Sequence, residues 1–119
     1  MKKSNLYLMK MNKLFLLPVL CFSVAVQAEL QTILSEDEWS RPRSAAVVKG
    51  FSAVDGVLQA WLKDTAKQRI ELRYPGGEEG GLWAQELKDW LVALGVPSNK
   101  LEVYPGYPSQ GEIALVVLP

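Results

Sequence analysis

The residues best suited to bind a ligand lie in one glycine-rich segment, residues 75–81, which follows an alternating pattern typical of a strand. Two carboxylates, Glu78 and Glu79, stand among four glycines, whose backbone freedom lets a ligand approach closely. Aromatic side chains flank the segment and could form the walls of a site for a cationic group or a basic segment of a partner. The candidate site residues are Tyr74, Gly76, Gly77, Glu78, Glu79 and Trp83.

Two other roles for the paired glutamates stay open. Carboxylates that precede a helix interact favourably with its dipole, so Glu78 and Glu79 could serve as a charged N-terminal cap on a tight turn. They could also contribute to a calcium site, although two adjacent carboxylates fall short of the full oxygen shell that calcium requires. The sequence therefore predicts no metal site and no cofactor.

The residue types that are missing exclude several kinds of catalysis. The chain has no histidine, and its only cysteine, Cys21, lies in the segment that we expect to be removed. A serine–histidine–aspartate triad and a thiolate nucleophile are therefore impossible in the mature chain. No serine has a lysine at the helical spacing that serine–lysine sites use. The sequence predicts a protein that is not an enzyme, with a hydrolase that uses paired carboxylates as the alternative.

The first 28 residues have the pattern of a cleavable signal peptide. Four lysines precede an apolar run over residues 14–26, and Ala28 provides the small residue before the cleavage point. The run of 13 residues is shorter than the roughly 20 that a membrane-spanning helix needs. We expect export to the periplasm. An uncleaved anchor and a lipoprotein acylated at Cys21 remain alternatives, and translation could begin at Met1, Met9 or Met11.

The charge of the mature chain narrows the class of partner. Residues 29–119 carry nine basic and 13 acidic side chains, a net charge of −4. This balance excludes nucleic acid and an anionic membrane surface as electrostatic partners, since both need clustered basic residues. A chain this small could also gain stability by forming a homodimer through the exposed edge of its sheet.

Residues 29–43 are expected to form an extended acidic arm outside the folded domain. The segment is rich in carboxylates, and Pro42 disfavours helix at the preceding residue. Ser35 could cap a single helical turn over residues 36–38. Trp39 does not belong to the apolar pattern of any predicted helix or strand, and whether it packs on the domain or docks elsewhere stays open.

Residues 44–119 are predicted to form a single α/β domain. A short apolar run at 45–48 predicts a strand, and apolar residues at helical spacing predict helices over 53–66 and 82–94. Alternating or continuous apolar patterns predict three further strands, at 68–74, 101–104 and 113–118. The last strand is the most apolar, which indicates a central position with both faces buried.

The order of these elements, β-α-β-α-β-β, predicts a two-layer α/β (α+β) sandwich. Two helices would cover one face of a small mixed sheet. The helices and strands alternate without any internal repeat, which favours one domain rather than several.

Part of this pattern resembles the C-terminal peptidoglycan-binding domain of OmpA-like proteins. Residues 70–73 are similar to the strand before that family's ligand loop, and residues 87–101 are similar to its second helix and the turn that follows. Pro105-Gly106-Tyr107 is similar in kind to a Gly-Tyr-Gly element of the family. The resemblance implies an OmpA-like fold in the cell envelope.

The ligand-binding residues of that family are missing here. The family holds a diaminopimelate carboxylate with an aspartate and an arginine, but the position of the arginine is occupied by Trp83 and no aspartate follows Tyr74. We therefore expect a non-catalytic periplasmic binding module of the envelope, which contacts a protein partner or a peptidoglycan component through other residues. The alternative is an accessory subunit of a secretion, pilus or polysaccharide assembly that uses residues 29–43 as its contact.

Overall fold

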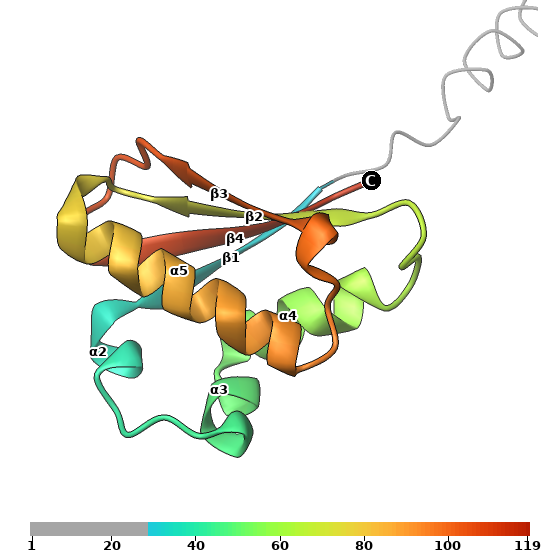
Figure 1. Cartoon of the computed structure of the whole chain (residues 1–119), viewed down its shortest axis with the longest axis horizontal. Coiled ribbons are helices and arrows are strands. Elements are labelled where there is room, and N and C mark those ends of the chain that lie inside the picture. Colours follow the sequence, from blue (N-terminus) through green and yellow to red (C-terminus); the bar gives the residue numbers. More distant parts are fainter. Residues whose placement is uncertain (1–28) are drawn as a thin grey trace, which may run out of the picture.

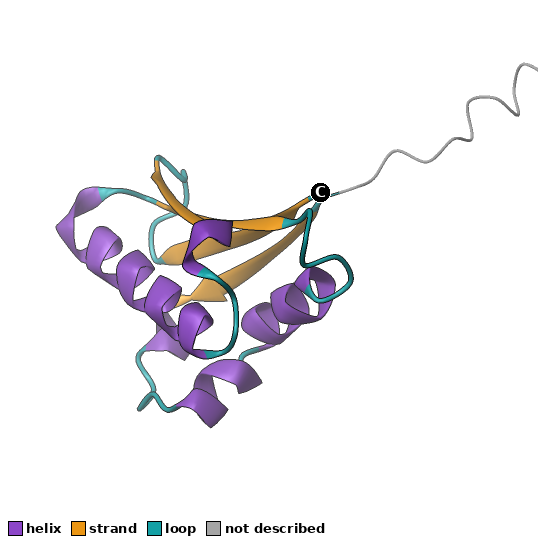
Figure 2. Cartoon of the chain, turned by 45° about the vertical axis from the view of Figure 1, so that its right-hand side comes forward, coloured by secondary structure: helices purple, strands orange, loops and turns teal. Residues whose placement is uncertain are grey.

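The computed structural model describes residues 29–119, and the predicted signal peptide lies outside the described residues. One four-stranded mixed sheet organises this part of the chain, with its helices gathered on one face (Figures 1 and 2). The spatial order is β1-β4-β2-β3, in which β4 is antiparallel to both neighbours and β2 is parallel to β3. The strands are β1 (Leu30–Ser35), β2 (Arg69–Tyr74), β3 (Leu101–Pro105) and β4 (Glu112–Leu118).

Four α-helices complete the unit, and α4 and α5 pack directly against the strands while α3 packs against these two helices. The predicted α+β sandwich is confirmed, and beyond the two long helices and the turn capped by Ser35 it contains one further short helix, over residues 45–50. The helices are α2 (Glu36–Trp39), α3 (Ala45–Gly50), α4 (Ser52–Trp61) and α5 (Gly77–Ala93), with a 3-10 turn η1 (Ser98–Lys100) before β3.

The central position predicted for the last strand is confirmed by the burial of β4. Ile113, Leu115 and Val117 join the hydrophobic core beneath the helices. Ala114 and Val116 alternate with them along the strand and so point to the opposite face, which none of the described helices covers (Figure 1). Both are nevertheless fully buried, and each lies between residues of the two neighbouring strands, Ala114 between Ile33 and Arg73 and Val116 between Gln31 and Glu71. β4 therefore pairs with a strand on each side and is buried on both faces of the sheet.

The strand predicted at residues 45–48 is wrong, since these residues form the first turns of α3. The hydroxyl of Ser44 accepts a hydrogen bond of 3.2 Å from the backbone N–H of Val47 and so caps the helix. Val48 is fully buried in the core. Four apolar residues fit a buried strand and a short helix equally well, and here the capping serine favours the helix.

The prediction of an arm outside the domain is also wrong, because residues 30–39 belong to the sheet and the core. β1 pairs with β4 along its whole length, and Leu34 is fully buried. The Thr32 hydroxyl donates a hydrogen bond of 2.9 Å to the backbone oxygen of Ala53 in α4. The helical turn capped by Ser35 is confirmed, and Trp39 packs into the core rather than docking elsewhere.

The helix boundaries also differ from the prediction. α4 ends at Trp61, five residues before the predicted limit, and α5 begins at Gly77 rather than at residue 82. Most of the glycine-rich segment is therefore the first turn of a 17-residue helix, not a loop. The tight turn that precedes it is formed by Gly76 and Gly77, whose φ angles of +101° and +79° favour glycine.

Candidate functional site

A hollow of about 450 Å³ opens at the end of the sheet where β2 finishes and β4 begins. It lies between the start of α5 and the short helix α2, which are separated in the sequence by α3, α4 and β2. Its lining combines three carboxylates and two indole rings with backbone and small side chains. The lining residues are Glu36, Trp39, Pro75, Gly76, Gly77, Glu78, Glu79, Gly80, Trp83, Gln110 and Gly111.

The carboxylates of the hollow are placed by the starts of two helices. Glu78 and Glu79 lie in the first turn of α5, where the positive end of the helix dipole stabilises their negative charge. Glu36 is the first residue of α2, and its backbone N–H donates a hydrogen bond of 2.8 Å to the carbonyl of Gly111. That bond fixes α2 to the start of β4 and holds Glu36 beside the hollow.

The electrostatic character of the hollow is strongly negative. Within residues 29–119, Glu36, Glu78 and Glu79 form no ion pair with any basic side chain, and all three are exposed to solvent. No lysine or arginine of this part of the chain lines the hollow. The arrangement therefore favours a positively charged group over an anion, even at a helix N-terminus.

Two indole rings form the apolar wall. The ring centroids of Trp39 and Trp83 lie 6.1 Å apart with an interplanar angle of 31°, and Phe51 packs against the other side of the cluster. Trp39 is buried, whereas Trp83 is only partly buried. The Trp83 indole N–H is shielded from solvent and has no acceptor among the described residues.

Arg43 shows that this aromatic cluster accommodates a cation. Its guanidinium carbon lies 4.5 Å from the centre of the Trp39 ring, and its Nη1 donates to the Trp39 carbonyl at 2.6 Å. Its Nε donates to Oε2 of Glu86 at 2.7 Å, and the Trp90 indole N–H donates to the same oxygen at 3.3 Å. Arg43 thus neutralises Glu86 and leaves the charges of the hollow uncompensated.

Five of the six predicted site residues come together around the hollow, and Tyr74 does not line it. Its ring instead packs on the adjacent turn of α5, where a Cβ atom at Gly80 would lie 3.1 Å from Cδ2 of the ring. Gly80 is therefore a packing requirement of Tyr74 rather than part of a flexible loop.

Sequence reasoning missed Glu36 and Trp39 as members of the site. Both lie in the segment predicted to be an arm, so nothing indicated that they would meet α5. The only signal was a weak alternation in β1, because Leu30 and Leu34 face the helices but Thr32 on the same face is polar and Ile33 on the opposite face is apolar. An alternating strand ahead of Ser35 would have placed the capped turn at a sheet end.

A second group of polar side chains lies on the face of the sheet that no helix covers. Arg73 Nη2 contacts Oε1 of Glu71 at 2.7 Å, and the phenol of Tyr104 donates a hydrogen bond to Glu102. This hydrogen bond, more than any other influence, raises the pKa of Tyr104 above its ordinary value of 10.0. The group lies on the neighbouring strands β2 and β3, and its β2 members Glu71 and Arg73 pair with Val116 and Ala114 of β4.

Among residues 29–119, no group of three or more histidine, cysteine, aspartate or glutamate side chains is arranged to hold a metal ion. No helix of the same range has both the length and the apolar character needed to cross a bilayer.

Comparison with known proteins gives no family for the chain. No protein-family model matches it, and no curated protein matches it in sequence.

Proposed function

We propose that this protein is an exported, non-catalytic binding module of the bacterial cell envelope, whose acidic hollow binds a cationic group of a partner protein or a wall component. The observation that carries the proposal is the meeting of two tryptophans with three carboxylates that form no ion pair within residues 29–119, around one cavity. A lysine or arginine side chain, or a free amine, has the size and charge that such a cavity favours.

The location in the envelope is supported by the sequence. The pattern of residues 1–28 is that of a signal peptide, and the resemblance to OmpA-like domains favours the periplasm. The family's carboxylate-binding arginine is replaced by Trp83, and the carboxylates Glu78 and Glu79 stand nearby. This exchange of charge is consistent with a ligand of opposite sign to the family's, an amine rather than a carboxylate.

The absence of catalysis is supported by the residue types. The mature chain lacks histidine and cysteine, and the carboxylates of the hollow are exposed rather than divided between a buried and a solvated environment. The alternative of an accessory assembly subunit depended on residues 29–43 as a free contact segment. Because β1 and Trp39 are part of the fold, deleting this segment would damage the domain and could not test that role.

The proposal is tested by co-sedimentation of the exported protein with purified peptidoglycan sacculi and by binding of a tetralysine peptide. The double variant Glu78→Gln, Glu79→Gln removes two carboxylates from the hollow while keeping their size. We expect it to weaken binding about fivefold, since two exposed ion pairs are lost and each contributes about 0.5 kcal/mol. The matched control Asp55→Asn, Asp89→Asn removes two exposed carboxylates elsewhere and should bind like the wild type.

Each outcome of this experiment decides between ligand classes. Sedimentation with sacculi that the hollow variant loses supports a wall component. Binding of tetralysine without sedimentation supports a basic segment of a protein partner. Binding of neither ligand, or equal weakening by the hollow variant and the control, would overturn the proposal.

A further inference from the structure

The two edge strands of the sheet differ in their protection against pairing with another strand. β3 carries Glu102 and ends at Pro105, and charges and prolines are the usual devices that blunt an exposed edge. β1 has the sequence Leu-Gln-Thr-Ile-Leu-Ser, with neither a charge nor a proline. From this contrast and the contacts below we infer that β1 pairs antiparallel with β1 of a second copy of this chain, which extends the sheet across a two-fold axis.

The backbone of β1 has hydrogen-bonding groups available on its free side. The bond from Glu36 N–H to Gly111 indicates which residues face β4, because partners alternate along an antiparallel ladder. By this alternation Gln31 and Ile33 turn their N–H and C=O groups away from β4. No described residue forms a hydrogen bond with these backbone groups. They are available to a strand added at this edge.

The side chains of β1 suit a second copy of the same strand. With the two-fold axis at Ile33, the two Ile33 side chains face each other on the helix-free face, and Gln31 faces the partner's Ser35. Ile33 is 36% exposed, so apolar surface would be buried by this pairing. A two-fold contact of this kind repeats every interaction twice and closes the assembly at two copies.

Charge complementarity argues for a second copy rather than an unrelated strand. The same register places Leu30 opposite the partner's Glu36, the start of the acidic turn of α2. Beside Leu30 a hollow of about 420 Å³ opens between β1 and α4, and it is lined by Lys63 and Thr32 among others. The acidic α2 of each copy would therefore lie near Lys63 of the other, and this attraction at both ends opposes the repulsion between Glu29 and the partner's Asp37 in the same register.

The test is the oligomeric state of the full chain as it is exported, measured by sedimentation equilibrium across a range of protein concentrations. We expect a reversible dimer. Ile33→Pro removes an N–H that faces away from β4, so the sheet of each copy is kept while the shared ladder is broken. This variant should weaken dimerisation at least about tenfold. The control Val92→Lys changes an exposed apolar residue on α5 and should leave the dimer unchanged.

A charge exchange tests the register. Lys63→Glu and Glu36→Lys should each weaken the dimer, and the double variant should restore it because both contacts are inverted together. A monomer at all concentrations, or a dimer that Ile33→Pro does not weaken, would overturn the inference. Failure of the double variant to restore association would contradict the register centred on Ile33.

The dimer and the proposed ligand share Glu36, so the variants that separate the two proposals leave this residue unchanged. Ile33→Pro leaves Glu78 and Glu79 in place, so a monomeric variant that still binds tetralysine separates the two proposals. Loss of tetralysine binding by the Glu78→Gln, Glu79→Gln variant, with the dimer intact, separates them in the other direction.

Discussion

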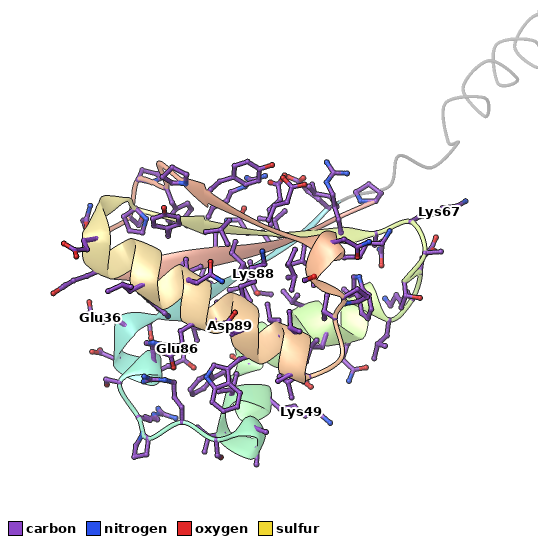
Figure 3. The ribbon with its side chains drawn as sticks, viewed as in Figure 1. Glu36, Lys49, Lys67, Glu86, Lys88 and Asp89 are labelled. Carbon is purple, nitrogen blue, oxygen red and sulfur yellow. The ribbon has the colours of Figure 1, made fainter. Side chains whose placement is uncertain are left out.

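The two ends of the sheet have hollows of similar size and opposite chemistry. At the end where β2 finishes, about 450 Å³ are enclosed by carboxylates and tryptophans. At the other end, near the start of β1, about 420 Å³ are lined by Lys63 and by apolar and amide side chains. Figure 3 shows the same polarity, with Glu36 at one end of the molecule and Lys67 at the other.

This difference shows that the size of a cavity does not identify the site. Both hollows could hold a small group, but only the acidic end has aromatic surface and unpaired charges of one sign. The acidic end is also anchored in the core through Trp39, whereas the basic end is bordered by the half-exposed Leu30. We therefore expect changes at the acidic end to affect stability and binding more strongly than changes at the basic end.

The largest expected effect is the loss of Trp39. Trp39→Ala removes a ring that is 93% buried and packs on Trp83 and Phe51, so it should destabilise the domain by about 3–5 kcal/mol. At the other end, Leu30→Ala should cost less than about 1 kcal/mol because that side chain is 38% exposed. Chemical denaturation measures both free energies of unfolding, and equal costs would contradict the asymmetry between the ends.

A smaller effect is expected from Gly111→Ala, which perturbs the contact between β4 and α2. The φ angle of Gly111 is +75°, and a Cβ atom there would lie 3.3 Å from Oε2 of Glu36. Strain and crowding together should cost about 1–2 kcal/mol. Gly50→Ala is the matched control, since nothing lies within 4 Å of its Cβ position and its φ is not positive. Equal free energies of unfolding for the two variants would contradict a structural requirement for glycine at position 111, beside α2.

The smallest effect concerns Tyr104, on the helix-free face. Its phenol should titrate above the ordinary value of 10.0, and Glu102→Gln should lower the pKa toward that value because a neutral amide replaces the charged carboxylate acceptor. A folded-state pKa above the unfolded value means that this contact stabilises the fold below pH 10 and loses its effect as pH rises through the raised pKa. Absorbance titration of the phenolate, with Tyr104→Phe subtracted, measures the shift, and an unchanged pKa in Glu102→Gln would refute the assigned cause.

The second half of the fold could be predicted from the sequence because its signals are long and periodic. The alternation of Ile70, Leu72 and Tyr74 gives β2, and the continuous apolar run of β4 gives a central strand. Helix α5 could be recognised from its apolar stripe, but its start could not. Four glycines indicate a loop by propensity, and the packing of Tyr74 on Gly80 outweighs that local preference.

The first half was harder to predict because its elements are short and depend on distant partners. β1 has a mixed polar pattern and acquires its identity from pairing with β4, about 80 residues away. The apolar run before Lys49 is too short to distinguish a strand from a helix. The candidate site combines residues from both halves. Glu78, Glu79 and Trp83 could be selected from local sequence, whereas Glu36 and Trp39 are brought to the site by the long-range pairing of β1.

The central claim is that the acidic end, and not the basic end, binds cations. A titration of the exported protein with tetralysine, followed through the four indole N–H resonances, tests it directly. We expect the Trp83 and Trp39 signals to shift while Trp61 stays unchanged, and the Glu78→Gln, Glu79→Gln variant to require about five times more peptide. Equal shifts for all four indoles, no shift at saturating peptide, or equal shifts with tetraglutamate would contradict the claim.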